Sequence, residues 1–151
     1  ILPTNPSPAR PAPAHRPKPD IIQAGNLQPI TLMENCIFCR IIAKNAPAAL
    51  LYEDEEVIAI EDIHPVARVH FLVIPKKHVD SLNDLASGDE PLIAHMIATA
   101  RGLAQARLGP EGAYRLVINT GADAGQSVFH LHLHIISGRP FLDRLVTRGL
   151  R

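Results

Sequence analysis

The chain has 151 residues, with 15 basic and 15 acidic side chains and no net formal charge when its histidines are neutral. This length is typical of one domain with a tail, and the balanced charge argues against nucleic acid as a partner. Apolar residues make up 46% of the sequence, yet no apolar run approaches the length of a membrane span, so we expect no membrane partner.

The first 32 residues differ in composition from the rest of the chain. Eight of the fourteen prolines lie there, namely Pro3, Pro6, Pro8, Pro11, Pro13, Pro17, Pro19 and Pro29. Proline at this density prevents helices and central strands, which predicts an extended or disordered tail over residues 1–32. The tail lacks the apolar stretch of a secretory signal, so we expect a cytoplasmic protein. Met33 resembles a natural start, and residues 33–151 are predicted to form the domain.

The pattern from Cys36 onward predicts two helices and five strands. A short helix is expected over residues 36–45, closed by Pro47, and a long amphipathic helix over residues 90–108, ended by Gly109. The five expected strands cover residues 50–53, 57–62, 69–74, 114–119 and 128–137. Short turns between the first three strands favour an antiparallel meander. A five-stranded antiparallel sheet covered by helices is an α+β architecture.

The last predicted strand carries histidine at every second position, as His130, His132 and His134. Because side chains alternate between the two faces of a strand, the three imidazoles should share one face. The opposite face should pack into the core with Phe129, Leu131, Leu133 and Ile135. Burying three imidazoles costs free energy unless each finds a partner. The stripe therefore favours metal binding, proton transfer or nucleophilic attack over a purely structural role.

A small, polar loop with two glycines, residues 119–128, precedes the histidines. Glycine lets a backbone approach a ligand closely and point its N–H groups at an anion. Asn119 and Ser127 add side-chain donors suited to phosphate oxygens. Such a loop is often only a connection between strands, but beside three histidines a phosphate cradle is the better interpretation.

Together these residues resemble the histidine triad (HIT) superfamily, whose signature is His-x-His-x-His followed by apolar residues. The resemblance covers about residues 36–141 and is greatest to the Hint branch of nucleoside phosphoramidases and its zinc-bearing bacterial relatives. The matching blocks are residues 62–65, 70–78, 119–121 and 125–134. The resemblance implies a HIT fold that forms a homodimer through its long helix and a central strand.

The resemblance also implies an activity, the hydrolysis of purine nucleoside 5′-phosphoramidates such as AMP or GMP conjugates. His132 would be the nucleophile that forms a nucleotidyl-histidine intermediate, with His134, Ser127 and His70 at the phosphate and the leaving group. The implied substrate-binding residues are Asp62, at the ribose, with Asn119, Gly125, Gln126, Ile37, Phe38, Ile41 and Ile63. Two alternatives remain open: a dinucleoside polyphosphate hydrolase, and a nucleotide-binding or scaffold protein with little catalysis. No organic cofactor is expected.

The only two cysteines, Cys36 and Cys39, form a Cys-x-x-Cys pair. Such a pair can be a redox dithiol, two buried thiols or half of a zinc site, and no βαβ pattern precedes it to favour the redox role. Zinc-bearing HIT proteins resemble this chain at four ligand positions, Cys36, Cys39, His78 and His130. The resemblance therefore implies one structural zinc per chain, and His130 would hold the backbone so that His132 presents the right nitrogen.

Overall fold

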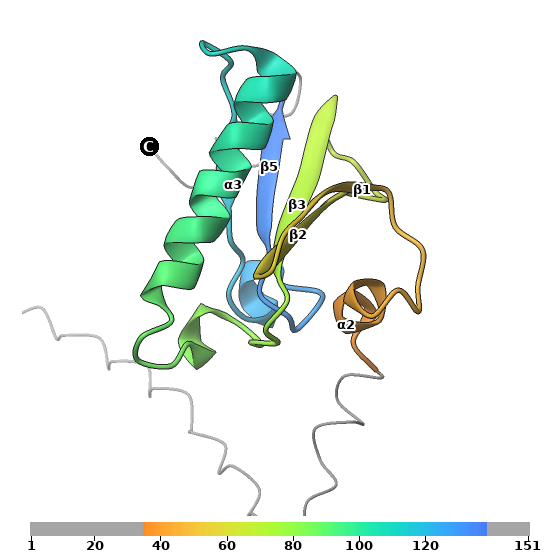
Figure 1. The fold of residues 1–151 in the computed structure, drawn as a ribbon, viewed down its shortest axis with the longest axis vertical. Helices are drawn as coiled ribbons and strands as arrows, with labels where there is room; N and C mark the ends of the chain where they lie inside the picture. Colours follow the sequence, from red (N-terminus) through yellow and green to blue (C-terminus); the bar gives the residue numbers. More distant parts are fainter. Residues whose placement is uncertain (1–34, 139–151) are drawn as a thin grey trace, which may run out of the picture.

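An antiparallel five-stranded sheet forms the centre of the fold, with one helix against each face (Figure 1). The structure is a computed structural model that describes residues 35–138. The predicted tail over residues 1–32 lies outside the described residues, as does the segment from residue 139 onward. None of the helices in the described part is long and apolar enough to cross a membrane.

The strands follow the spatial order β1-β2-β3-β5-β4, and every neighbouring pair is antiparallel. Their bounds are Leu50–Glu53 for β1, Val57–Glu61 for β2, Val69–Pro75 for β3, Arg115–Val117 for β4 and Leu133–Ser137 for β5. The short helix α2 covers Ile37–Ile42, and the long helix α3 covers Glu90–Leu108. The predicted α+β architecture, with five antiparallel strands, one short helix and one long helix, is therefore confirmed.

The α3 face of the sheet holds the larger core. Every fourth residue of α3 is buried there, as Leu92, Met96, Ala100 and Ala104. This spacing keeps the four side chains on one stripe of the helix, which packs on residues of β2, β3 and β5. Ile97 lies outside that stripe and is 43% exposed, because it follows Met96 by one residue and points about 100° away around the helix.

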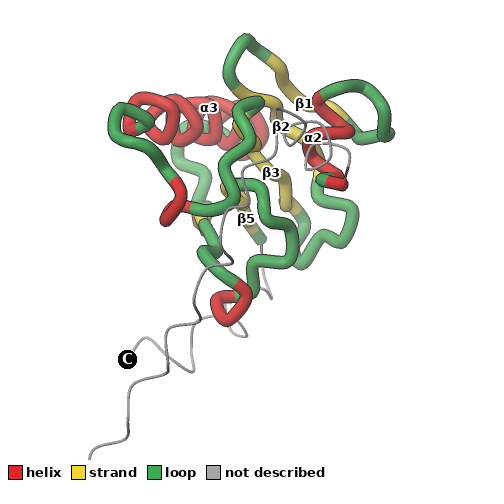
Figure 2. Tube along the Cα trace, turned by 90° about the horizontal axis from the view of Figure 1, so that it is seen from below, coloured by secondary structure: helices red, strands yellow, loops and turns green. Residues whose placement is uncertain are grey.

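Helix α2 covers the opposite face, as the two views in Figures 1 and 2 show. Its Phe38 packs with a smaller cluster formed by Ile58, Ile60, Leu72 and Ile74. These residues alternate with core residues of the α3 face along β2 and β3, so both strands are buried on both sides. Phe38 is the main apolar contact that holds α2, and with it Cys36 and Cys39, against the sheet.

Strand β5 is shorter than the sequence predicted. Pairing with β3 ends where Val73 faces Leu133, two residues before Pro75, which has no N–H for the ladder. The preceding segment leaves the sheet and instead follows the loop after β3, where the Leu131 N–H donates to the Val79 carbonyl at 2.6 Å. Of the three histidines, only His134 lies within a strand.

The alternation of side chains survives in most of this segment but not at its start. Leu131, Leu133 and Ile135 are buried in the α3 core, as predicted. Phe129 is 51% exposed, so its predicted place in the core is wrong. The physical reason is that the strand pairing which would have fixed its orientation ends four residues later in the chain, at Leu133.

Candidate catalytic and metal sites

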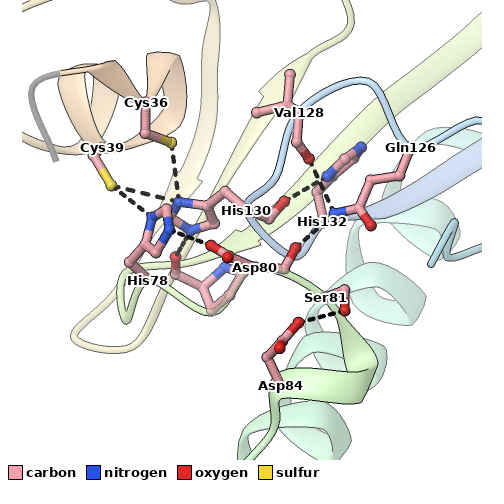
Figure 3. A network of polar contacts seen from close by, with 11 residues as sticks. Cys36, Cys39, His78, Asp80, Ser81, Asp84, Gln126, Val128, His130 and His132 are labelled. Carbon is pink, nitrogen blue, oxygen red and sulfur yellow. Dashed lines mark hydrogen bonds and ion pairs between the residues drawn. The ribbon is translucent and has the colours of Figure 1, made fainter. Parts of the chain in front are cut away.

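Two sulfur and two nitrogen atoms that could bind a metal ion converge at the N-terminal end of α2 (Figure 3). Cys36 is the N-cap residue of α2 and Cys39 lies within it, so both thiols leave the same side of one helical turn. The Cys39 Sγ lies 3.1 Å from His78 Nδ1 and 3.5 Å from His130 Nδ1, and the Cys36 Sγ lies 3.4 Å from His130 Nδ1. The structure thus brings together all four residues that the resemblance implied as ligands.

Both histidines of this cluster have their other ring nitrogen fixed. His130 Nε2 donates to the Pro75 carbonyl at 2.8 Å, and His78 Nε2 donates to the Asp80 carboxylate at 2.8 Å. Because those oxygens accept, both rings carry their proton on Nε2 and turn the lone pair of Nδ1 toward the sulfurs. This arrangement, a ligand histidine oriented by a carbonyl or carboxylate, is typical of zinc sites.

The donor set fits a tetrahedral metal ion. Two thiols and two imidazoles offer ligand atoms that all lie within 4.8 Å of one another, and such Cys₂His₂ sets are characteristic of structural zinc. Burial, with Cys36 as a neighbour, raises the pKa of the Cys39 thiol to about 12. An ion bound here would therefore have to displace a firmly held proton from Cys39.

A cavity of about 190 Å³ lies beside this cluster, between α2 and the ends of β2 and β5. Its apolar wall includes four of the residues that were expected to bind substrate, Ile37, Phe38, Ile41 and Ile63. Its polar wall includes Asp62, Ser127, His132 and His134. A larger hollow of about 520 Å³ lies near the start of α3, but it contains no histidine or cysteine. We therefore place the chemistry of the chain in the smaller cavity.

His132 is held in one tautomer by the backbone. Its Nδ1 lies 2.7 Å from the carbonyl oxygen of His130, so Nδ1 carries the proton and Nε2 keeps a lone pair. The ring is 5% exposed and stands edge-on to Phe38, with the ring centroids 5.2 Å apart. Burial lowers the pKa of His132, against the opposing effects of the backbone hydrogen bond and the Asp62 charge. A neutral imidazole with a free lone pair is what nucleophilic attack requires.

His70 and His134 form a hydrogen-bonded pair next to His132. The Val66 N–H donates to His70 Nδ1 at 3.3 Å, so His70 carries its proton on Nε2, 2.9 Å from His134 Nδ1. The Asp62 carboxylate lies 3.3 Å from the same His70 nitrogen. Burial, with the neighbouring His132 and His70 rings, lowers the pKa of His134 to about 4. Both rings of the pair can therefore act as neutral hydrogen-bond donors at neutral pH.

Comparison with known proteins identifies the family. A family model described as "Scavenger mRNA decapping enzyme C-term binding" matches residues 35–142. An uncharacterized HIT-like protein from Synechocystis sp. is 47% identical over 110 residues, which are 73% of this chain and 96% of that protein. The chain belongs to the HIT family.

Solved structures of HIT proteins have the same fold. A HIT family hydrolase from Legionella pneumophila matches with a TM-score of 0.67 at 44% identity, covering 70% of this chain and 94% of that chain. A Zn-bound histidine triad family protein from Mycobacterium smegmatis matches with a TM-score of 0.63 at 39% identity, covering 72% of this chain and 78% of that one. This HIT domain is thus similar to HIT family hydrolases in both sequence and structure.

Three residues of the loop before the triad do not line the cavity of the HIT domain, although they were expected to bind substrate. Gln126 is 3% exposed, and its amide is fully used within the protein. Its oxygen accepts from the Gly121 N–H at 2.8 Å, and its nitrogen donates to the carbonyls of Asp80 at 2.6 Å and Val128 at 3.1 Å. These hydrogen bonds position the loop, and the expected role of Gln126 as a substrate ligand stays a prediction.

The other two residues are Asn119 and Gly125, which lie outside the lining of the cavity. Gly125 has a φ of 87°, a left-handed conformation that ends the short 3₁₀ helix Ala122–Ala124 and that glycine adopts without strain. In this structure Gly125 therefore shapes the loop that delivers Ser127 to the cavity.

Two residues at the sites were missed by the sequence analysis. His64, for which the sequence predicted no role, lines the cavity, and its N–H donates to the Asp62 carboxylate at 2.7 Å. Asp80 orients the ring of His78, a member of the cluster with Cys36, Cys39 and His130. Each pair has a two-residue spacing in the sequence, Asp62 with His64 and His78 with Asp80. An aspartate bonding to a backbone two residues on is a common turn, so the first of these signals was available.

Proposed function

We propose that this HIT protein hydrolyses purine nucleoside 5′-phosphoramidates through a nucleotidyl-histidine intermediate at His132, as in the Hint branch that it resembles. The observation that carries the proposal is the hydrogen bond of 2.7 Å from His132 Nδ1 to the His130 carbonyl. This hydrogen bond leaves the lone pair of Nε2 free for attack, and His132 lines the cavity. The family relation to HIT hydrolases supports the same reaction class.

In the first step, His132 Nε2 attacks the α-phosphorus and the bond from phosphorus to the amine nitrogen breaks. The amine leaves with the bonding electrons and must take up a proton, which the hydroxyl of Ser127, as the bridge to the leaving group, would pass to it from solvent. His134 donates to the phosphate oxygens from the same cavity wall. General-acid help of this kind is worth roughly 10²–10⁴-fold in rate. Water then attacks phosphorus, the bond to His132 breaks, and the nucleoside monophosphate and a proton are released.

The walls of the cavity suit the two ends of a nucleoside. Asp62 would accept hydrogen bonds from the ribose hydroxyls, and its carboxylate is already oriented by the His64 N–H. Ile37, Phe38, Ile41 and Ile63 would form an apolar slot for the base. Such a slot has few polar groups and discriminates weakly between bases, so the purine preference rests on the resemblance. AMP and GMP conjugates are the substrates to test.

We also propose that Cys36, Cys39, His78 and His130 hold a structural zinc ion, as in the zinc-bearing HIT relatives. The donor set, the oriented histidines and the Zn-bound relative from Mycobacterium smegmatis support this assignment. When bound, the ion would cross-link α2, the loop after β3 and the segment before β5. His130 would then serve twice, because its ring is a ligand and its carbonyl holds His132. A cytoplasmic homodimer formed through α3 and a central strand completes the proposal.

The test measures AMP release from an adenosine phosphoramidate and from diadenosine tetraphosphate in parallel. We expect turnover of the phosphoramidate in the wild type, loss of it in His132→Ala, and an acid-labile nucleotidyl adduct on the wild-type chain alone. His95→Ala is the matched control, since His95 lies on α3, outside the cavity, and pairs with Asp54.

Three outcomes would contradict the proposal. Preference for the tetraphosphate would indicate a polyphosphate hydrolase. Absence of turnover with both substrates would favour a binding or scaffold protein. Equal activity of His132→Ala and wild type would exclude His132 as the nucleophile.

A further inference from the structure

A second group of possible metal-ligating atoms lies beside His132. It is separate from the cluster of Cys36, Cys39, His78 and His130, which we call the cysteine cluster. The second group consists of Asp62, His70 and His134, whose ligand atoms all lie within 4.8 Å of one another. Asp62 follows the last residue of β2, while His70 and His134 lie on the neighbouring strands β3 and β5. The three side chains therefore meet on a rigid part of the sheet, and the rings of His132 and His134 are 4.8 Å apart.

The spacing of the three atoms matches a tetrahedral ion. Zinc bonds of about 2.0–2.2 Å at tetrahedral angles separate neighbouring ligand atoms by roughly 3.3–3.5 Å. Here His70 Nε2 lies 3.3 Å from Asp62 Oδ2 and 2.9 Å from His134 Nδ1, and His134 Nδ1 lies 3.9 Å from Asp62 Oδ2. Shifts of a few tenths of an ångström would make the three distances equal.

The group also has an open side. His70 is 6% exposed, but Asp62 and His134 line the cavity that contains His132. An ion held by the three residues would face that cavity with its fourth position. Two imidazoles and a carboxylate with an open position are the ligands of zinc sites that accept an exogenous ligand. The cysteine cluster differs from this arrangement, since it supplies four protein ligands.

We propose that Asp62, His70 and His134 form a second metal site, which takes a divalent transition-metal ion such as zinc from the cavity. Binding requires one rearrangement of a proton. The proton of His70 moves from Nε2 to Nδ1, and the ring gives up the hydrogen bond from the Val66 N–H. That bond is long, at 3.3 Å, and Val66 is 51% exposed, so little structure opposes the change.

Occupation of this site excludes a nucleotide, a consequence that rests on the proposed function. Asp62 would no longer accept the ribose hydroxyls, and His134 would no longer face the phosphate. The ion would therefore inhibit competitively and raise KM, while an ion in the cysteine cluster would not. Free zinc would support the fold at one site and block the reaction at the other.

The experiment titrates the full chain with Co²⁺ and Zn²⁺ and measures ions bound per chain and the visible spectrum. We expect two Co²⁺ ions in the wild type, of which one shows thiolate-to-cobalt charge transfer and the other does not. Asp62→Asn and His70→Gln should each keep the thiolate band and lose the second ion. His95→Gln is the matched control: His95 also pairs with a carboxylate, that of Asp54, but the two belong to no three-residue cluster in the described part of the chain. It should keep both ions.

Binding of a single ion by the wild type, or retention of the second ion in both Asp62→Asn and His70→Gln, would overturn the proposal. Added AMP provides a separate comparison. Displacement of the second ion by AMP supports competition at Asp62. A second ion that is bound but indifferent to AMP would count against the nucleotide site of the proposed function, while the stoichiometry would still establish the metal site.

Discussion

Two clusters lie beside His132: the cysteine cluster of Cys36, Cys39, His78 and His130, and the Asp62 cluster of Asp62, His70 and His134. Both contain histidines, but in different surroundings. In the cysteine cluster, His130 is fully buried, and both of its ring nitrogens already face a partner. In the Asp62 cluster, His134 lines a cavity, and its Nδ1 faces His70 and, at 3.9 Å, the Asp62 carboxylate. Only three residues separate these two histidines along the chain, yet one is enclosed and the other faces a cavity. Both residues are histidines, so residue type alone does not determine which role each can take. Burial and hydrogen-bond partners determine it.

The difference arises where the chain joins the sheet. His134 lies in β5 opposite Leu72, so the ladder fixes its direction. His130 precedes β5, where the segment follows the loop after β3 and turns its ring toward α2. His132 lies between the two and is oriented by the carbonyl of His130. The stripe of histidines is therefore divided by the start of one strand.

The largest expected effect compares two neighbouring members of the triad. His132→Ala should reduce phosphoramidate turnover by at least about 10³-fold, because it removes the nucleophile, and should lower the melting temperature less than His130→Ala, because water in the cavity that His132 lines can reach the freed His130 carbonyl. His130→Ala should instead lower the free energy of unfolding by about 2–4 kcal/mol, since it opens a cavity and leaves the Pro75 carbonyl unpaired. Steady-state kinetics and thermal melts check the pair. Equal losses of stability in the two variants would break the distinction between the clusters.

Removal of metal should separate the clusters further. If the cysteine cluster binds zinc, stability rises by about 4 kcal/mol when free zinc exceeds Kd a thousandfold. A chelator should remove this contribution, and Cys39→Ser should remove the part of the response to zinc that comes from the cysteine cluster. Calorimetry at several zinc concentrations measures the shift. A melting temperature independent of zinc and of chelator would show that the cluster is not a structural metal site.

A smaller effect is expected at Gln126, which connects the surroundings of the two clusters. Gln126→Ala would leave the Gly121 N–H and the carbonyls of Asp80 and Val128 without their side-chain partner, so we expect about 2–3 kcal/mol of destabilisation. Ser127 follows in the chain, and kcat should fall more than KM rises. Chemical denaturation and full kinetic curves test both parts. A change in KM alone would support the predicted role of Gln126 as a substrate ligand.

The smallest effect is expected at Asp54, which belongs to neither cluster. Burial acts to raise the pKa of Asp54, but N–H donors from Val57 and Glu56, with His95 and Tyr52, outweigh it and hold the pKa well below its ordinary value. Asp54→Asn should cost about 1–2 kcal/mol at neutral pH. Because the folded pKa is lowered, this stability is present above about pH 4, the pKa of an unfolded aspartate, and is lost as the pH falls further.

Denaturation of wild type and Asp54→Asn between neutral and strongly acidic pH measures this difference. The two stability curves should converge below pH 4. A gap that stays constant in acid would mean that the ionised carboxylate contributes nothing. Phosphoramidate turnover should be the same in both proteins at neutral pH, because Asp54 contributes to stability and not to the reaction.

Much of the fold was predictable because local patterns and tertiary contacts agree. The bounds of β1 and α3 are those predicted, since turn residues and the helical repeat define them. The prediction failed for β5, where the histidine alternation continues beyond the ladder. Alternation describes which side chains share a face, and it cannot tell where a partner strand stops. The exposed Phe129 follows from this failure.

The sequence by itself determined the family, the order of helices and strands and the residue types that form both clusters. It did so because the residues of each motif lie close together in the chain, and because the side-chain type limits the chemistry that each residue can perform. Only the tertiary structure decided which histidine faces sulfur, which faces a carboxylate and where the Gln126 amide is used. Among those contacts, Cys36–His130 and Asp80–Gln126 join residues 94 and 46 positions apart in sequence. Packing of α2 and the loops on the sheet fixes them, and no local pattern encodes that packing.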